Sequence, residues 1–284
     1  MHSPIFSLEV FPPKPHAPVG TIYDALDGLQ GLDPDFISVT YRHGSHANRL
    51  NTARIAHTVN ADYRIPVVAH LTALYSDKAS VDEALDLFRK AGVFGVLALR
   101  GDYVEGNEPC GDFEHASDLA AYIRQHDPDM QIMGACYPEC HLEASCLEVD
   151  VDNLKKKVDA GVTHLITQLF YDNEDFYRFL DLARAKGIDV PIEAGIMPIR
   201  SVRSINNMTK RNGSKIPSEV QRIVDKWGDN LPCLQQAGIN YASEQISDLV
   251  AHGVDGIHLY TMNRPAIARR IWSNVEQLFS VTPQ

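Results

Sequence analysis

Short runs of strand-type apolar residues recur along the chain, and each ends abruptly at polar residues. Runs without polar alternation are typical of strands that are buried on both faces of a parallel sheet. The clearest run covers residues 95–99 and stops at Arg100-Gly101-Asp102. Runs of this kind predict eight strands, at 5–11, 35–41, 66–71, 95–99, 131–137, 163–170, 191–197 and 256–262.

Segments with helical periodicity lie between most of these strands. They predict helices at 22–30, 48–61, 81–91, 151–160, 174–186 and 266–279, and a longer helical segment over 201–254. At the helix over 81–91 we predict Ser80 as the N-cap, with Glu83 completing a capping box. Gly161 is expected to end the helix over 151–160.

The alternation of strands and helices predicts a single-domain (β/α)₈ barrel over residues 1–284. An open doubly wound sheet is the alternative architecture. The sequence contains no linker rich in Gly, Pro or Ser and no shift in composition, so we expect no second domain.

Polar side chains follow seven of the eight predicted strands, and the seventh strand contributes none. They are Glu9, Thr40, Tyr41, His70, Arg100, Asp102, Tyr137, Glu139, His141, Gln168, Tyr260, Thr261, Asn263 and Arg264. Each alone could be a hydrogen-bonded structural residue. Together they favour a ligand site at the strand ends, because polar groups at the edge of a core cost free energy unless a partner satisfies them.

The net charge of −11, from 26 basic and 37 acidic residues, argues against a general nucleic-acid binder. Residues 1–15 contain Glu9 and four prolines and do not read as a signal peptide, and no apolar stretch approaches the roughly 18 residues of a membrane helix. We therefore expect a cytoplasmic protein that contacts no membrane. Five scattered cysteines indicate reduced thiols.

Several familiar ligand motifs are absent from the sequence. There is no G-x-G, no G-x-x-x-x-G-K-[ST], no H-E-x-x-H and no G-x-S-x-G, so a nucleotide cofactor would need another kind of cradle. Residues 136–146 contain Cys136, Cys140, His141 and Cys146, which are zinc-type ligands. Because they include no C-x-x-C pair and Cys136 lies in a strand, we predict no metal site.

Taken as a set, the motifs at the strand ends resemble the methylenetetrahydrofolate reductase family. The matching segments occur in order at 6–14, 39–41, 70–72, 97–102, 137–141, 154–161, 166–168 and 260–264. Each segment is short, but their order and their placement at strand ends make the set specific. The chain is similar to the catalytic barrel alone, without the C-terminal regulatory domain of eukaryotic members.

The resemblance implies an enzyme that reduces 5,10-methylenetetrahydrofolate to 5-methyltetrahydrofolate, the methyl donor for methionine synthesis. Its cofactor would be FAD, which takes hydride from NADH or NADPH and passes it on in a ping-pong cycle. We also expect a homo-oligomer. Glu9 would be the general acid, since a carboxyl group held away from bulk water can keep a proton to deliver. Asp102 would lie near the pyrimidine edge of the flavin and the pterin of the folate.

The remaining site residues are also carried over from the resemblance. Substrate contacts would come from Glu9, Asp102, Gln168, Ser204 and Arg264, with Arg264 suited to the p-aminobenzoate or glutamate portion. The flavin contacts would be Thr40, Tyr41, His70, Arg100, Gly101, Asp102, Ala116, Tyr137, His141, Ala144, Asp150, Asn153, Lys156 and Lys157. Arg100, His141 and the two lysines suit the pyrophosphate and adjacent polar groups.

The chain departs from the bacterial pattern at two places. Residues 42–45 read Arg-His-Gly-Ser where bacterial relatives usually have smaller residues. Ser204 and Met208 stand where familiar bacterial enzymes carry a glutamine that helps hold folate and an aromatic residue that stacks on nicotinamide. The electron donor therefore stays open between NADH, NADPH and another reductant.

Two other classes of function compete with this interpretation. A non-flavin barrel enzyme acting on a pterin or a small carbonyl substrate would need a Schiff-base lysine or a metal, and no predicted strand ends in Lys. The other is a catalytically silent folate- or flavin-binding barrel. The retained Glu9 argues against that alternative.

Overall fold

The computed structural model describes residues 3–13, 20–41 and 46–280, in which eight strands form a closed barrel in sequential order. The strands are β1 (Ile5–Val10), β2 (Phe36–Val39), β3 (Val67–Thr72), β4 (Gly95–Leu99), β5 (Gln131–Cys136), β6 (His164–Thr167), β7 (Ile192–Ile196) and β8 (Gly256–Tyr260). Each overlaps a run predicted from the sequence. The predicted (β/α)₈ barrel is confirmed, while Lys14 and the distinctive 42–45 segment lie outside the described residues.

The helices are α1 (Gly20–Leu29), α2 (His46–Ala61), α3 (Lys78–Lys90), α4 (Ala116–His126), α5 (Leu147–Asp159), α6 (Asn173–Ala185), α7 (Val202–Asn212), α8 (Ser218–Trp227), α9 (Leu231–Ala251) and α10 (Pro265–Phe279). Sequence analysis missed α4. Its buried side rests chiefly on Leu119, Ala120 and Ile123, too few apolar residues for a distinct periodic signal. The Asp118 carboxylate accepts a hydrogen bond from the His115 backbone N–H at 2.8 Å and so stabilises the start of α4.

The N-cap predicted for α3 is wrong. Asp77 caps the helix, and its carboxylate accepts a hydrogen bond from the Ser80 backbone N–H at 2.8 Å. Glu83 instead pairs with Arg49 of α2, at 2.7 Å between Nη2 and Oε2. Ser and Asp are both good caps, so the local sequence alone did not distinguish them.

The chain divides into two compact units. One, the β1–β5 unit, comprises Ser7–Ala135 and Lys156–Leu165, and the other, the β6–β8 unit, comprises Met1–Phe6, Cys136–Lys155 and Ile166–Gln284. The prediction of a single domain stays a prediction.

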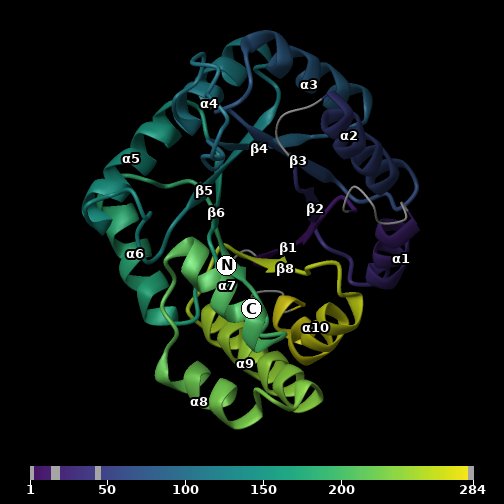
Figure 1. Ribbon diagram of the computed structural model, residues 1–284, viewed down its shortest axis with the longest axis vertical. Coiled ribbons are helices and arrows are strands. Elements are labelled where there is room, and N and C mark those ends of the chain that lie inside the picture. The colour runs from purple at the N-terminus through teal and green to yellow at the C-terminus, as the bar shows by residue number, and fades with distance from the viewer. Residues whose placement is uncertain (1–2, 14–19, 42–45, 281–284) are drawn as a thin grey trace. The chain divides into compact units, whose positions relative to one another are not determined.

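Parallel pairing organises the β1–β5 unit. The register places Glu9 of β1 beside Ser38 of β2 and His70 of β3 beside Leu97 of β4. Figure 1 shows α1, α2, α3 and α4 on the outer side of the strands of this unit. Because side chains alternate between the two faces of a strand, His70 and Thr72 share one face of β3, and Leu71 lies on the other.

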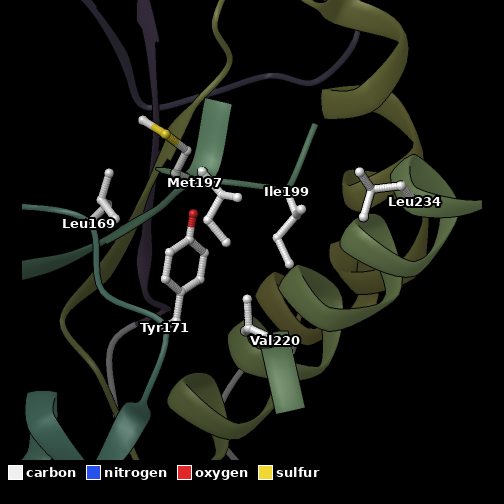
Figure 2. Close-up of a cluster of buried hydrophobic side chains, with 7 residues drawn as sticks. Leu169, Tyr171, Met197, Ile199, Val220 and Leu234 are labelled. Atoms are coloured by element: carbon white, nitrogen blue, oxygen red, sulfur yellow. The ribbon is translucent and has the colours of Figure 1, made fainter. Parts of the chain in front are cut away.

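The long helical segment in the β6–β8 unit has an apolar cluster of its own. Figure 2 shows side chains from the segments that follow β6 and β7 packed with residues of α8 and α9. The buried members are Leu169, Tyr171, Met197, Ile199, Ile205, Val220 and Leu234. The cluster anchors α7, α8 and α9 to the ends of two strands.

None of the helices in the described part of the chain combines the length and apolar character needed to cross a membrane. The cytoplasmic location expected from the sequence stays a prediction.

Gly238 lets α9 approach the chain after β7. A Cβ atom at this position would lie 2.3 Å from the Ile199 carbonyl oxygen, too close for either backbone to remain in place. We therefore expect Gly238→Ala to lower the free energy of unfolding by about 1–3 kcal/mol, although alanine normally stabilises a helix by up to about 1 kcal/mol relative to glycine. Chemical denaturation measures the change.

Gly20→Ala is the matched control, because a Cβ atom there meets nothing within 4 Å. A Gly238→Ala variant as stable as the wild type would contradict the close approach of α9 to Ile199.

Candidate active site

Glu9 and His70 meet in the interior of the β1–β5 unit. The Glu9 Oε2 and His70 Nε2 atoms are 3.5 Å apart, and both side chains are buried. They come from β1 and β3, which lie on either side of β2, as expected where alternate strands of a barrel contribute side chains to one interior layer. Carboxyl and imidazole groups are side chains of the kind that serve as general acids and bases.

The segment after β4 passes close to the end of β3. Gly101 has φ +90°, and a Cβ atom there would lie 3.3 Å from the Thr72 Cβ atom. The Leu74 backbone N–H donates to the Arg100 carbonyl oxygen at 2.9 Å, which fixes the segment against the chain that follows β3. The predicted Arg-Gly-Asp turn therefore requires glycine for both its conformation and its lack of a side chain.

Arg100 and Asp102 occupy different environments within this turn. Arg100 is half-buried; its Nε atom donates to the Gly101 carbonyl oxygen at 3.3 Å, and its guanidinium lies 5.1 Å from the centre of the Tyr103 ring. Asp102 is exposed. Arg100 thus contacts the Gly101 carbonyl oxygen and the Tyr103 ring. A simple ion pair between Arg100 and Asp102 at the strand end would not predict these contacts.

Thr40 and Tyr41 follow β2, and Ala116 is buried at the start of α4. The Tyr41 side chain is buried beside the Arg49 guanidinium. Burial raises the pKa of the Tyr41 phenol, and the Arg49 charge opposes that rise. The phenol therefore stays protonated and can donate a hydrogen bond at neutral pH.

Of the two lysines predicted to contact the flavin, Lys156 is exposed and Lys157 has a structural contact. The Lys157 Nζ atom donates to the Ala135 carbonyl oxygen at 2.6 Å. Its aliphatic chain lies over Gly134, where an added Cβ atom would be 3.1 Å from the Lys157 Cδ atom. The sequence pattern did not predict this attachment to β5.

In the β6–β8 unit, the turn after β5 brings together four of the predicted residues. The Asp150 carboxylate accepts a hydrogen bond from the His141 backbone N–H at 2.8 Å, and the Ala144 N–H donates to the His141 carbonyl oxygen at 2.9 Å. The Tyr137 and His141 rings pack edge to face, with their centroids 4.7 Å apart. Asn153 lies farther along α5 and is exposed.

Glu139 lies in the same turn and has a structural partner. Its Oε1 atom accepts a hydrogen bond from the Lys215 backbone N–H at 2.8 Å. Burial raises the pKa of its carboxyl group.

The predicted substrate residues of this unit follow three strands. Gln168 follows β6, and its side-chain oxygen accepts a hydrogen bond from the Leu169 N–H at 2.9 Å. Ser204 lies in the first turn of α7 after β7, and Arg264 is the exposed N-cap residue of α10 after β8. Parallel pairing of β7 and β8 brings the ends of those two strands to one edge of the unit.

Arg200 is the polar residue near the end of the seventh strand that sequence analysis missed. It lies four residues beyond β7, so a search restricted to the strand end did not include it. Its Nη2 atom donates to the Ser204 hydroxyl oxygen at 3.0 Å. Burial and the positive charge of Arg264 both lower the pKa of the Arg200 guanidinium.

The cysteine cluster considered as a metal site is dispersed. Cys136 is buried, whereas Cys146 is exposed. The described residues contain no group of three or more His, Cys, Asp or Glu side chains that could hold a metal ion.

Comparisons with known proteins identify the family to which this chain belongs. The family model of methylenetetrahydrofolate reductase matches residues 1–276. A methylenetetrahydrofolate reductase (NADH) of Arabidopsis thaliana is 36% identical over 272 residues, which cover 91% of the chain and 46% of that protein. The 5,10-methylenetetrahydrofolate reductase of Escherichia coli is 34% identical over 269 residues, covering 93% of the chain and 88% of that protein. The chain thus spans about half the length of the plant relative and most of the bacterial one.

A solved structure supports the fold. It is that of a Clostridium thermocellum protein described as binding two copies of 5-methyl-5,6,7,8-tetrahydrofolic acid, and it aligns over 99% of this chain and 96% of its own with a TM-score of 0.67. At 16% identity, this likeness concerns the fold alone. The family resemblance of the strand-end motifs is confirmed by the family model and the bacterial relatives: the chain belongs to the methylenetetrahydrofolate reductase family.

Proposed function

We propose that this chain catalyses the FAD-dependent reduction of 5,10-methylenetetrahydrofolate to 5-methyltetrahydrofolate. The observation that carries the proposal is the family match over residues 1–276. The bacterial relatives, 88% of whose length the chain covers, are named for this activity. The folate named for the similar Clostridium thermocellum structure is the product of the same reaction.

The residues of the β1–β5 unit fit a flavin. The Thr72 Oγ1 atom is buried without a hydrogen-bond partner among the described residues, and Gly101 presents backbone without a side chain. Such atoms suit the polar edge of a ring that carries hydrogen-bond donors and acceptors. When bound, FAD would accept hydride from the donor and pass it to the folate.

The flavin contacts are assigned separately in each unit. In the β1–β5 unit they would be Thr40, Tyr41, His70, Arg100, Gly101, Asp102, Ala116, Lys156 and Lys157, and in the β6–β8 unit Tyr137, His141, Ala144, Asp150 and Asn153. The Lys157 ammonium, which donates to the Ala135 carbonyl oxygen, would supply positive charge to an anionic group of the cofactor.

Glu9 would supply the proton that the reduction requires. Opening the five-membered ring of the substrate breaks a carbon–nitrogen bond, and protonation of the departing nitrogen assists that step. The Glu9 carboxyl is buried and has His70 3.5 Å away, which can orient it and return a proton after each turnover. Burial of both side chains keeps bulk water from competing for the proton.

The proposed substrate contacts are Asp102 with Glu9 in the β1–β5 unit and Gln168, Ser204 and Arg264 in the β6–β8 unit. The donor would be NADH or NADPH; the names of the plant relatives specify NADH. We also propose that the protein is cytoplasmic, that it forms a homo-oligomer and that its product supplies methyl groups for methionine synthesis.

The first prediction concerns the cofactor. Purified protein should be yellow, and denaturation should release FAD that chromatography identifies. Colourless protein that also fails to take up added FAD would reject the flavin assignment and favour a non-flavin barrel enzyme.

The second prediction concerns the acid. Glu9→Gln should retain the flavin and its reduction by NAD(P)H but slow the reduction of methylenetetrahydrofolate by about 10²–10⁴-fold, the usual contribution of a general acid. Stopped-flow spectroscopy follows the two half-reactions separately. Glu276→Gln on the exposed side of α10 is the control. Near-normal folate turnover in Glu9→Gln would show that another group delivers the proton.

The third prediction concerns Asp102. A carboxylate near the flavin disfavours negative charge on the reduced ring, so Asp102→Asn should raise the midpoint potential of the bound flavin. Spectroelectrochemistry measures the potential, with exposed Glu105→Gln as a charge-matched control. The same potential in Asp102→Asn and wild type would place this carboxylate away from the ring.

A further inference from the structure

The backbone around Arg200 is held in place by the helices that follow β7. Ile199 lies in the buried cluster of Figure 2, and the Gln235 side chain of α9 donates to the Arg200 carbonyl oxygen at 3.4 Å. Gly238 packs directly against the Ile199 backbone. The backbone of Arg200 is therefore held in place, and the hydrogen bond from its side chain to the Ser204 hydroxyl orients the guanidinium.

The Arg200 charge lacks an anionic partner in the described part of the chain. Its Nε atom is buried and has no hydrogen-bond partner there, and neither Arg200 nor Arg264 forms an ion pair with a described carboxylate. Arg184 of the same unit shows the usual arrangement: its Nη2 atom bonds the Asp255 carboxylate at 2.7 Å. A half-buried guanidinium beside a second cation is unfavourable unless an anion joins them.

Arg200 lies near two residues that the family resemblance assigns to substrate binding, Ser204 and Arg264. It bonds Ser204 directly. Arg200 follows β7 and Arg264 follows β8, and the parallel pairing of these two strands brings their ends to one edge. Burial and the Arg264 charge both lower the pKa of Arg200.

We infer that Arg200, oriented by Ser204, binds a carboxylate of the glutamate portion of the folate together with Arg264. The inference rests on the proposed function, which makes folate the substrate. The glutamate portion carries two carboxylates, and a guanidinium can pair with a carboxylate through two parallel hydrogen bonds. Arg200 is then a residue that determines how strongly this enzyme depends on the glutamate of its substrate.

The test compares two ligands and three variants by isothermal titration calorimetry of the flavin-loaded enzyme. The ligands are 5-methyltetrahydrofolate and its pteroate counterpart, which lacks glutamate. Arg200→Gln should weaken binding of 5-methyltetrahydrofolate by about tenfold or more and leave pteroate binding unchanged. A tenfold loss corresponds to about 1.4 kcal/mol of binding free energy. Arg200→Lys, which keeps the charge without the planar fork, should lose less.

Arg203→Gln is the matched control, because Arg203 lies three residues from Arg200, in the first turn of α7, but is exposed. It should bind both ligands as the wild type does. Circular dichroism establishes that each variant is folded, and Arg200→Lys keeps the test decisive should Arg200→Gln fail to fold.

Three results would overturn the inference. Unchanged folate binding in Arg200→Gln, or an equal loss for folate and pteroate, would show that Arg200 does not contact the glutamate. The same variants are also titrated with NADH and NADPH, and weaker binding of NADPH alone, with NADH and folate unaffected, would assign the anion to the nucleotide phosphate. If any of these results is found while the wild-type enzyme reduces methylenetetrahydrofolate, the proposed function stands and only the role of Arg200 is wrong. A wild-type enzyme that neither binds nor reduces folate would overturn both the proposed function and the role of Arg200.

Discussion

Parallel pairing of the strand backbones is the constraint on which the other features of this protein depend. Within each unit it directs the carboxyl ends of neighbouring strands to one edge, so residues far apart in the sequence come together. Glu9 and His70, separated by 61 positions, meet at 3.5 Å for this reason. Because both belong to strands, their backbones are held by the ladder, and the pair needs little further support.

The charged groups of the candidate site differ in how they are compensated. Glu9 has His70 beside it. Arg200 and Arg264 instead place two positive charges near each other without a described carboxylate. Compensated charges can be maintained by the protein alone, whereas uncompensated ones indicate where a ligand of opposite charge would contribute.

The helices between β7 and β8 hold the backbone around Arg200 in place. Their apolar cluster includes Ile199, the residue immediately before Arg200, and Gly238 of α9 packs against the same backbone. Packing remote from any ligand therefore sets the position of a polar side chain near the strand ends. The same cluster includes Ile205 of α7, the residue after Ser204, so both members of the Arg200–Ser204 pair are anchored by it.

The apolar runs alone predicted the strands, because a strand buried on both faces must be continuously apolar. Their alternation with helices favoured a barrel over an open doubly wound sheet, and the tertiary structure shows the closed barrel. The polar residues at the strand ends predicted that Glu9, His70 and Arg100 lie near a ligand site, and the structure brings Glu9 and His70 together. Local sequence was ambiguous where several residues had similar propensities, as with Asp77 and Ser80, or where the apolar face was short, as in α4. Only the tertiary structure decided which side chains meet: Lys157 with the Ala135 carbonyl, and Arg200 with Ser204 near Arg264. These contacts depend on distances between elements, which packing sets and no periodicity in the sequence encodes.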